Sequence, residues 1–127
     1  MIVVDASAAV SGLVRAGPAR NRLATEALHA PHLLDTEVAD AIRNLVLRRA
    51  VTGDEADQVL SGWRRLGLHR YPTIGMIDRI WELRHNVSAY DAAYVALAET
   101  LGCHLVTADQ RLAGAEGPRC IIEVVPR

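Results

Sequence analysis

The sequence contains no lysine, no phenylalanine and only two cysteines among its 127 residues. Cys103 and Cys120 stand alone, without the spacing of a zinc site or a disulfide framework, so we expect two buried thiols in a reducing compartment. No apolar run approaches the ~18 residues that a membrane span needs, and the first run lacks the basic flank of a signal peptide. These absences predict a cytoplasmic protein without a membrane anchor.

The absence of lysine and the serine at position 7 argue against two classes of protein. A receiver domain of two-component signalling has a similar length and acidic strand ends, but its chemistry needs a lysine beside the phosphoryl group. All 14 basic residues of this chain are arginines. A haloacid-dehalogenase-type phosphatase would need an aspartate two residues after Asp5, where this chain has Ser7.

The composition that is present indicates one globular domain. Hydrophobic residues make up 50% of the chain and charged residues 23%, which is typical of a folded protein. A chain of this size predicts a single domain over residues 1–127. The formal net charge of −1 gives no general attraction for nucleic acid, so any such contact must be local.

Short apolar segments alternate with amphipathic patterns along the whole chain. Apolar runs of this length predict strands, which we place at 2–4, 32–34, 68–71, 104–106 and 121–125. Helical spacing and capping residues predict helices at 8–14, 18–28, 36–50, 52–66, 73–86 and 88–100. Thr52 with Glu55 three residues later has capping-box spacing, and Gly102 fits the stop of the last of these helices. This alternation predicts an α/β fold, an α/β/α sandwich around a five-stranded parallel sheet.

Four acidic residues fall where strands end or helices begin. Asp5 follows the first strand, and Asp109 lies just past the fourth. Glu37 and Asp91 each fall in the first turn of a predicted helix. Ligands of open α/β sheets bind beyond the carboxyl ends of the strands, so all four carboxylates could meet there. Carboxylates gathered in one place need a cation, and an all-oxygen set favours Mg²⁺ or Mn²⁺.

Each acid also has a purely structural interpretation. Asp91 stands three residues after Ser88, which is capping-box spacing, and Asp109 has the position of an N-cap. Asp5 and Glu37 would complement helix dipoles, with Ser7 as the expected N-cap of the first helix. Both interpretations stay open at this point, although the joint pattern of the four favours a metal site.

The sequence blocks around these acids resemble the PIN-domain ribonucleases, and most of all the VapC toxins of bacterial toxin–antitoxin pairs. The blocks follow one another in the order and spacing of that family, over the whole chain. They are Ile-Val-Val-Asp-Ala-Ser at 2–7, Thr-Glu-Val at 36–38, Ser-Ala-Tyr-Asp-Ala-Ala-Tyr-Val-Ala-Leu-Ala at 88–98 and Val-Thr-Ala-Asp-Gln-Arg-Leu at 106–112. The two later blocks are the specific ones.

The resemblance implies a Mg²⁺-dependent endoribonuclease, with Mn²⁺ as a substitute, that leaves a 5′-phosphate and a 3′-hydroxyl. The residues that it assigns are Asp5, Asp91 and Asp109 as metal ligands, Glu37 as a ligand or water-orienting base, and Ser7 and Thr107 as accompanying hydroxyls. Some relatives carry another acid where this chain has Arg111, which leaves one metal or two open. The RNA could be a tRNA, a ribosomal RNA or a messenger.

The resemblance also implies protein partners. A VapB-type antitoxin would block the site, for example with an arginine in place of the cation, and the chain would form a homodimer. Apolar helix faces at 38–46 and 56–66 are the surfaces expected to take part. The rival hypothesis is a catalytically inactive PIN-like binding module whose acids only cap helices.

Other polar and aromatic residues receive simpler interpretations. Asp40 is expected to be a solvated charge, and the scattered histidines are not expected to bind metal. Helical spacing places four aromatic residues in the core, namely Trp63, Trp81, Tyr90 and Tyr94. A group of helical arginines is expected to be mainly solvated, with phosphate contact as the alternative, namely Arg43, Arg48, Arg49, Arg64 and Arg65.

Overall fold

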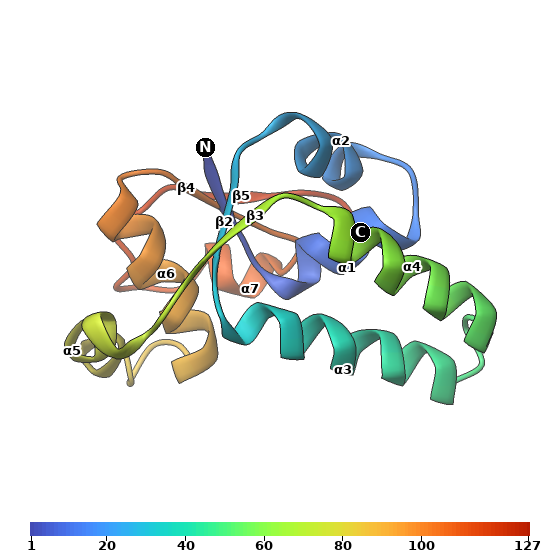
Figure 1. The fold of residues 1–127 in the computed structure, drawn as a ribbon. Helices are drawn as coiled ribbons and strands as arrows, with labels where there is room; N and C mark the ends of the chain where they lie inside the picture. The colour runs from blue at the N-terminus through green and yellow to red at the C-terminus, as the bar shows by residue number, and fades with distance from the viewer.

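A computed structural model describes all residues, 1–127, and has one five-stranded parallel sheet between two layers of helices (Figure 1). The strand order is β3-β2-β1-β4-β5. The strands are β1 (Ile2–Val4), β2 (Leu28–Pro31), β3 (Leu68–Tyr71), β4 (His104–Thr107) and β5 (Ile122–Val124). The predicted α/β/α sandwich with a five-stranded parallel sheet is confirmed.

The helices divide into two groups by what they contact. The first group packs together on one side of the sheet and comprises α1 (Ala6–Val14), α2 (Pro18–Thr25), α3 (Leu33–Leu47) and α4 (Gly53–Arg65). The second comprises the 3₁₀ helix η1 (Ile74–Met76), α5 (Ile77–Glu82) and α6 (Ala89–Leu101), and α7 (Gln110–Ala113) lies beside β4 and β5. None of these helices is both long and apolar enough to cross a membrane.

The second strand lies earlier than the sequence pattern predicted. The strand is β2 (Leu28–Pro31), whereas Leu33 and Leu34 belong to the first turn of α3. Leu34 is buried because it begins the core-facing stripe of that helix, which continues to Val38. A short apolar run has no periodicity of its own, so the pattern could not separate a strand from a helical turn. The helix α2 correspondingly ends at Thr25, three residues before the predicted end, because Leu28 belongs to β2.

Several local predictions are confirmed by the backbone. The Thr52 hydroxyl accepts from the Glu55 backbone N–H (3.1 Å), and the Glu55 carboxylate accepts in return from the Thr52 N–H (3.2 Å). This reciprocal pair is the capping box that starts α4. Gly102 ends α6 with a positive φ of 66°, a conformation that glycine adopts without strain.

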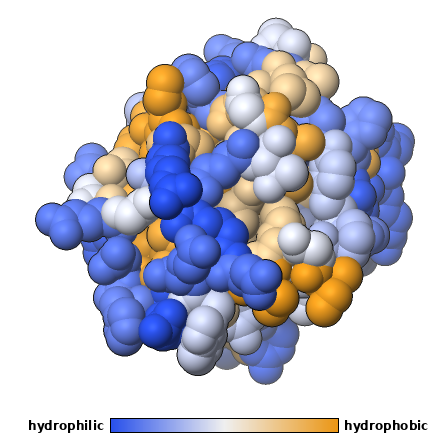
Figure 2. Space-filling view, turned by 90° about the vertical axis from the view of Figure 1, so that its left-hand side faces the viewer, coloured by the Kyte–Doolittle hydropathy of each residue, from blue (hydrophilic) through white to orange (hydrophobic).

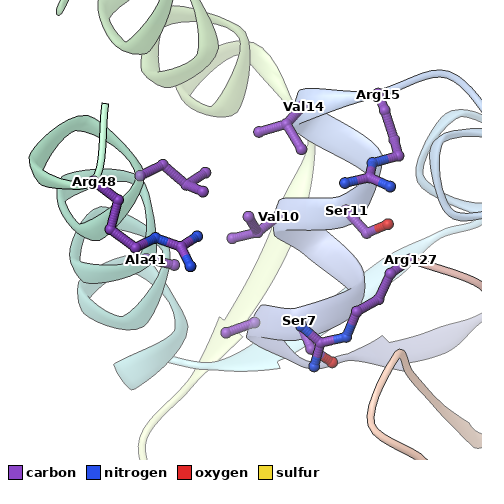
Figure 3. Close-up of a pocket in the computed structure, with 10 residues that line it drawn as sticks. Ser7, Val10, Ser11, Val14, Arg15, Ala41, Arg48 and Arg127 are labelled. Carbon is purple, nitrogen blue, oxygen red and sulfur yellow. The ribbon is translucent and has the colours of Figure 1, made fainter. Parts of the chain in front are cut away.

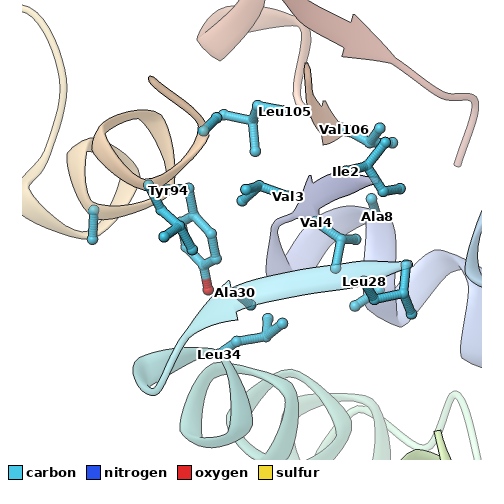
Figure 4. Packing of buried hydrophobic residues seen from close by; sticks show 14 of the residues in the cluster. Ile2, Val3, Val4, Ala8, Leu28, Ala30, Leu34, Tyr94, Leu105 and Val106 are labelled. Carbon is cyan, nitrogen blue, oxygen red and sulfur yellow. The ribbon is translucent and has the colours of Figure 1, made fainter. Parts of the chain in front are cut away.

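The core forms on both faces of β1. Val3 and Val4 are fully enclosed, and Leu105 on the neighbouring strand lies beside them (Figure 4). On one side α6 contacts the sheet through a run of buried residues from Ala92 to Ala98. Small alanine side chains let this helix approach closely, which brings its first turn up to the end of β1.

The strand order reverses next to β1. From β1 the chain moves to β2 and β3 on one side, and then β4 pairs with β1 on the other. The carboxyl ends of β1 and β4 therefore flank the crevice where ligands bind in doubly wound sheets. Asp5 and Thr107 stand at those two strand ends.

Candidate active site

Asp5 is held rigidly at the end of β1. One carboxylate oxygen, Oδ1, accepts from the Ala8 backbone N–H (3.0 Å) and the Ser7 hydroxyl (2.7 Å). The other, Oδ2, accepts from the Thr107 hydroxyl (2.5 Å). Asp5 is thus the N-cap of α1, and the prediction that Ser7 has this role is wrong. The cap is two residues earlier because the strand runs directly into the helix.

The Ser7 and Thr107 hydroxyls join the ends of β1 and β4. Each donates its proton to Asp5 and accepts from the loop after β4: the Ala108 N–H donates to Ser7 Oγ (2.8 Å), and the Asp109 N–H to Thr107 Oγ1 (3.0 Å). Each hydroxyl thus donates its only proton to Asp5 and accepts one bond from the start of the Asp109 loop. Both therefore act as positioning groups.

Glu37 comes from the other side of the crevice. It lies in the second turn of α3, and not the first as predicted, because α3 begins at Leu33. Its carboxylate accepts from the Tyr94 hydroxyl. Burial raises the pKa of Glu37, and the charges of Asp91 and Asp5 raise it further, whereas the hydrogen bond from Tyr94 lowers it. The sequence predicted that Tyr94 lies in the core, and its ring is buried there. The periodic pattern could not predict that its hydroxyl would bond to Glu37.

Asp91 is half-buried in the first turn of α6. The Ser88 hydroxyl accepts from the Asp91 backbone N–H (3.1 Å) and so caps the helix. The Asp91 carboxylate makes no return bond to the Ser88 N–H, unlike that of Glu55 in α4. Burial, and then the charges of Asp5 and Asp109, raise the pKa of Asp91. The Ser88 hydroxyl opposes this rise. The reciprocal bond of a capping box is therefore absent, and the Asp91 carboxylate lies within the charge influence of Asp5 and Asp109.

Asp109 does have the capping role that its position suggested. It is the N-cap of α7, where its Oδ1 accepts from the Arg111 backbone N–H (2.9 Å). The Arg111 guanidinium also donates to both carboxylate oxygens (3.3 Å each). Arg111 lowers the pKa of Asp109, and Arg127 lowers it further through its charge. An arginine thus neutralises the one acid of the four that is nearest to solvent.

The four acids lie around one crevice and act on one another. Asp5 raises the pKa of Glu37 and Asp91, and Asp109 raises the pKa of Asp5 and Asp91. No three carboxylate, imidazole or thiolate side chains are close enough, as oriented here, to form a metal-binding group. Glu37 is engaged by Tyr94 and Asp109 by Arg111. The donor set fits a hard divalent cation, because only oxygen ligands are present and their like charges repel.

These pKa shifts predict how the metal-free protein responds to pH. Asp5, Glu37 and Asp91 have pKa values raised above the ordinary 3.8, 4.5 and 3.8, so the folded state binds more protons than the unfolded state. Stability should therefore fall as pH rises from these ordinary values through the raised ones. Thermal melts in a chelator across this range check it. Asp91→Asn should flatten the slope, and an equal slope in that variant would contradict the assignment.

The remaining predictions have mixed outcomes. Trp63 and Tyr94 are buried as expected, whereas Trp81 and Tyr90 are 67% and 65% exposed, so their core assignment is wrong. For Trp81 the reason is the change from η1 to α5, which interrupts the helical phase predicted over 73–86. Tyr90 lies on the exposed side of the first turn of α6. Asp40 is a solvent-exposed charge, as expected.

The cysteines differ from expectation, because Cys103 and Cys120 are free thiols that are only partly buried. Burial raises the pKa of Cys120 to about 11.

The apolar faces of α3 and α4 are partly used within the chain. Val38 and Trp63 are buried in the core, whereas Leu45 and Leu60 are only partly buried. A role of these faces as partner surfaces stays a prediction.

Comparisons with known proteins show the family to which this fold and sequence belong. Residues 2–117 match the family model described as PIN domain, and the chain belongs to this family. It resembles two solved structures in fold. One is PAE2754 from Pyrobaculum aerophilum (TM-score 0.65, 24% identity, 95% of this chain and 82% of that chain). The other is VapC20 of Mycobacterium tuberculosis, described as a Sarcin-Ricin loop cleaving toxin (TM-score 0.63, 19% identity, 90% and 94%).

Two of its sequence relatives belong to one group within the PIN-domain family, the VapC ribonucleases. The chain is 53% identical to Ribonuclease VapC9 of Mycobacterium tuberculosis over 127 residues, which is the full length of both proteins. It is 43% identical to Ribonuclease VapC1 of the same species, over 97% of this chain and 96% of the relative. The chain is thus a PIN-domain protein of the VapC type.

Proposed function

We propose that this chain is a metal-dependent endoribonuclease, a toxin that cleaves cellular RNA and is neutralised by a cognate antitoxin. The observation that supports the proposal is the charge coupling that links Asp5, Glu37, Asp91 and Asp109, with Asp5 and Asp109 at the carboxyl ends of β1 and β4. Full-length identity to proteins named ribonucleases supports it. The substrate is a tRNA, a ribosomal RNA or a messenger.

In the proposed mechanism Asp5, Asp91 and Asp109 hold a Mg²⁺ ion, for which Mn²⁺ can substitute. Such a cation lowers the pKa of water and neutralises charge on the phosphodiester. The Ser7 and Thr107 hydroxyls keep Asp5 in one orientation. Asp109 must release Arg111 to bind the ion, which frees that guanidinium for a phosphate oxygen.

Glu37 is the proposed base, or an additional ligand. Its half-buried carboxylate has a raised pKa, which brings its proton affinity closer to the working pH, as general-base catalysis favours. Its bond from Tyr94 fixes the carboxylate, leaving the second oxygen to orient and deprotonate the attacking water. In-line attack of the water oxygen on phosphorus breaks the P–O3′ bond. The O3′ leaving group takes a proton from solvent, which gives a 3′-hydroxyl on one fragment and a 5′-phosphate on the other.

The proposed partners follow from charge and from exposed apolar surface. A VapB-type antitoxin could place an arginine among the carboxylates, since a guanidinium pairs well with them. We also propose a homodimer in the cytoplasm. Four large apolar residues are exposed along η1, α5 and the start of α6, and offer the surface for it: Ile74, Ile77, Trp81 and Tyr90. Figure 2 shows hydrophobic patches between hydrophilic ridges on this side of the molecule.

A catalytically inactive PIN-like binding module is the second candidate, because Asp5 and Asp109 do cap helices. Purified protein incubated with total RNA separates the two functions. An endoribonuclease yields discrete 5′ ends with Mg²⁺ and none in a chelator. A binding module yields the same RNA in both conditions. Mapping those ends also identifies the substrate.

A further inference from the structure

A groove beside the acidic crevice is lined by arginines that have no partner. It lies between α1 and α3 and encloses about 250 Å³. Its walls are apolar, formed by Val10, Val14 and Leu45 among others, and Ser7 lies at one end. A second hollow of about 480 Å³ adjoins it and shares Arg48 and Arg127, so the groove continues along α3.

The arginines come from three separate segments. Arg15 ends α1, Arg48 follows α3, and Arg127 lies at the C-terminal end of the described chain; their guanidinium groups all extend into the same space (Figure 3). No acidic residue lines the groove. None of the three takes part in an ion pair, whereas Arg22, Arg70 and Arg79 each do.

This concentration of charge is unusual for this chain. The whole protein has a formal net charge of −1, so three arginines around a groove with no acidic residue in its lining are a local excess. Like charges that share a hollow repel, and an anion between them relieves that repulsion. The groove is therefore complementary to a negatively charged occupant.

The groove also runs directly into the candidate active site. Ser7, which lines it, donates a hydrogen bond to Asp5. Arg127, on its other wall, is near enough to Asp109 to influence that carboxyl. An occupant of the groove would thus enter the acidic crevice at Ser7. An elongated occupant is favoured over a compact one, because the two hollows join into one groove that continues along α3.

We propose that this groove binds the single-stranded RNA backbone on one side of the scissile phosphate, through Arg15, Arg48 and Arg127. The proposal rests on the proposed ribonuclease function and adds the path of the substrate. Guanidinium groups bind phosphates with two parallel hydrogen bonds. Val10, Val14 and Leu45 supply an apolar wall for ribose and base faces. Phosphate contacts set position without reading sequence, so the groove contributes affinity and register.

The test measures RNA binding without cleavage. Asp91→Asn is the background, the probe is a short labelled single-stranded RNA of mixed sequence, and the dissociation constant is determined over a salt series. Arg15→Ala and Arg48→Ala should each reduce the slope of log K against log[salt] by about 0.7. If each variant and the background bind equally at ~1 M salt, this slope difference makes the variant bind about fivefold more weakly than the background at ~0.1 M salt. Arg65→Ala, at the exposed end of α4, is the matched control and should bind as the background does.

A second measurement uses the otherwise unchanged protein with Mg²⁺. Arg15→Ala and Arg48→Ala should raise KM for RNA cleavage about fivefold with kcat little changed, because phosphate contacts outside the reacting group bind ground state and transition state alike. If both variants bind and cleave RNA as Arg65→Ala does, the groove proposal is wrong even though the chain is a ribonuclease. Normal RNA binding together with lost affinity for an oligoglutamate peptide would also overturn it, in favour of an acidic protein segment.

The two proposals can fail separately. If the unchanged protein does not cleave RNA but the arginine substitutions weaken RNA binding with the predicted salt dependence, the groove proposal stands and the nuclease proposal falls.

Discussion

Asp91→Asn is expected to reduce Mg²⁺-dependent RNA cleavage by about 1,000-fold or more while leaving the metal-free protein as stable as before or more stable. Removal of one preorganised group that stabilises transition-state charge typically costs about 100- to 1,000-fold, and a metal ligand also sets occupancy of the ion. Stability should not suffer, because the helix cap is the bond from the Asp91 backbone N–H to Ser88, which asparagine retains. The repulsion from Asp5 and Asp109 is relieved.

Two variants separate catalysis from capping in this experiment. Asp40→Asn removes an exposed carboxylate of α3 and should leave both cleavage and melting unchanged. Ser88→Ala removes the cap and should cost about 1 kcal/mol of unfolding free energy, with cleavage largely kept. Initial cleavage rates and thermal melts in a chelator supply the two readouts. A large loss of metal-free stability in Asp91→Asn, with cleavage intact, would assign Asp91 a structural role.

Arg79→Met should lower the unfolding free energy by about 2 kcal/mol, between the values for exposed and for fully buried ion pairs. Arg79 Nε donates to Glu99 Oε1 (2.7 Å) and Nη2 to Glu99 Oε2 (3.0 Å). Nη2 also donates to the Gly117 carbonyl (2.9 Å), which ties α5, α6 and the loop before β5 together. The side chains of Arg79 and Glu99 are only 19% and 15% exposed. Methionine would leave the Glu99 charge mostly enclosed and without its main partner.

Chemical denaturation of two further variants defines the origin of that loss. Glu82, the exposed third partner at 3.1 Å, should contribute under about 1 kcal/mol, so Glu82→Gln serves as the control. Arg79→Met combined with Glu99→Leu should recover much of the loss, because apolar residues replace a buried pair at little cost. Equal losses in Arg79→Met and Glu82→Gln would mean that the pair is weakly coupled to the fold.

The sequence by itself determined the elements whose signals are local. The uninterrupted Ile2–Val4 run indicated a strand buried on both faces, and Thr52 with Glu55 indicated a helix start. Parallel alternation then placed Asp5 and Asp109 at one edge of the sheet. These inferences succeeded because burial period, capping and the alternation of strands with helices each depend on residues close together in the chain.

Only the tertiary structure decided which partners those residues meet. The apolar run before Asp35 became the first turn of α3, since Leu28–Pro31 takes the place between β1 and β3. The hydrogen bond from Tyr94 to Glu37 and the grouping of Arg15, Arg48 and Arg127 join segments far apart in the chain. Such contacts depend on how helices pack on the sheet, and no periodic pattern records that packing. The positions of the four acids could therefore be predicted from the sequence, whereas the groups that orient and neutralise them could not.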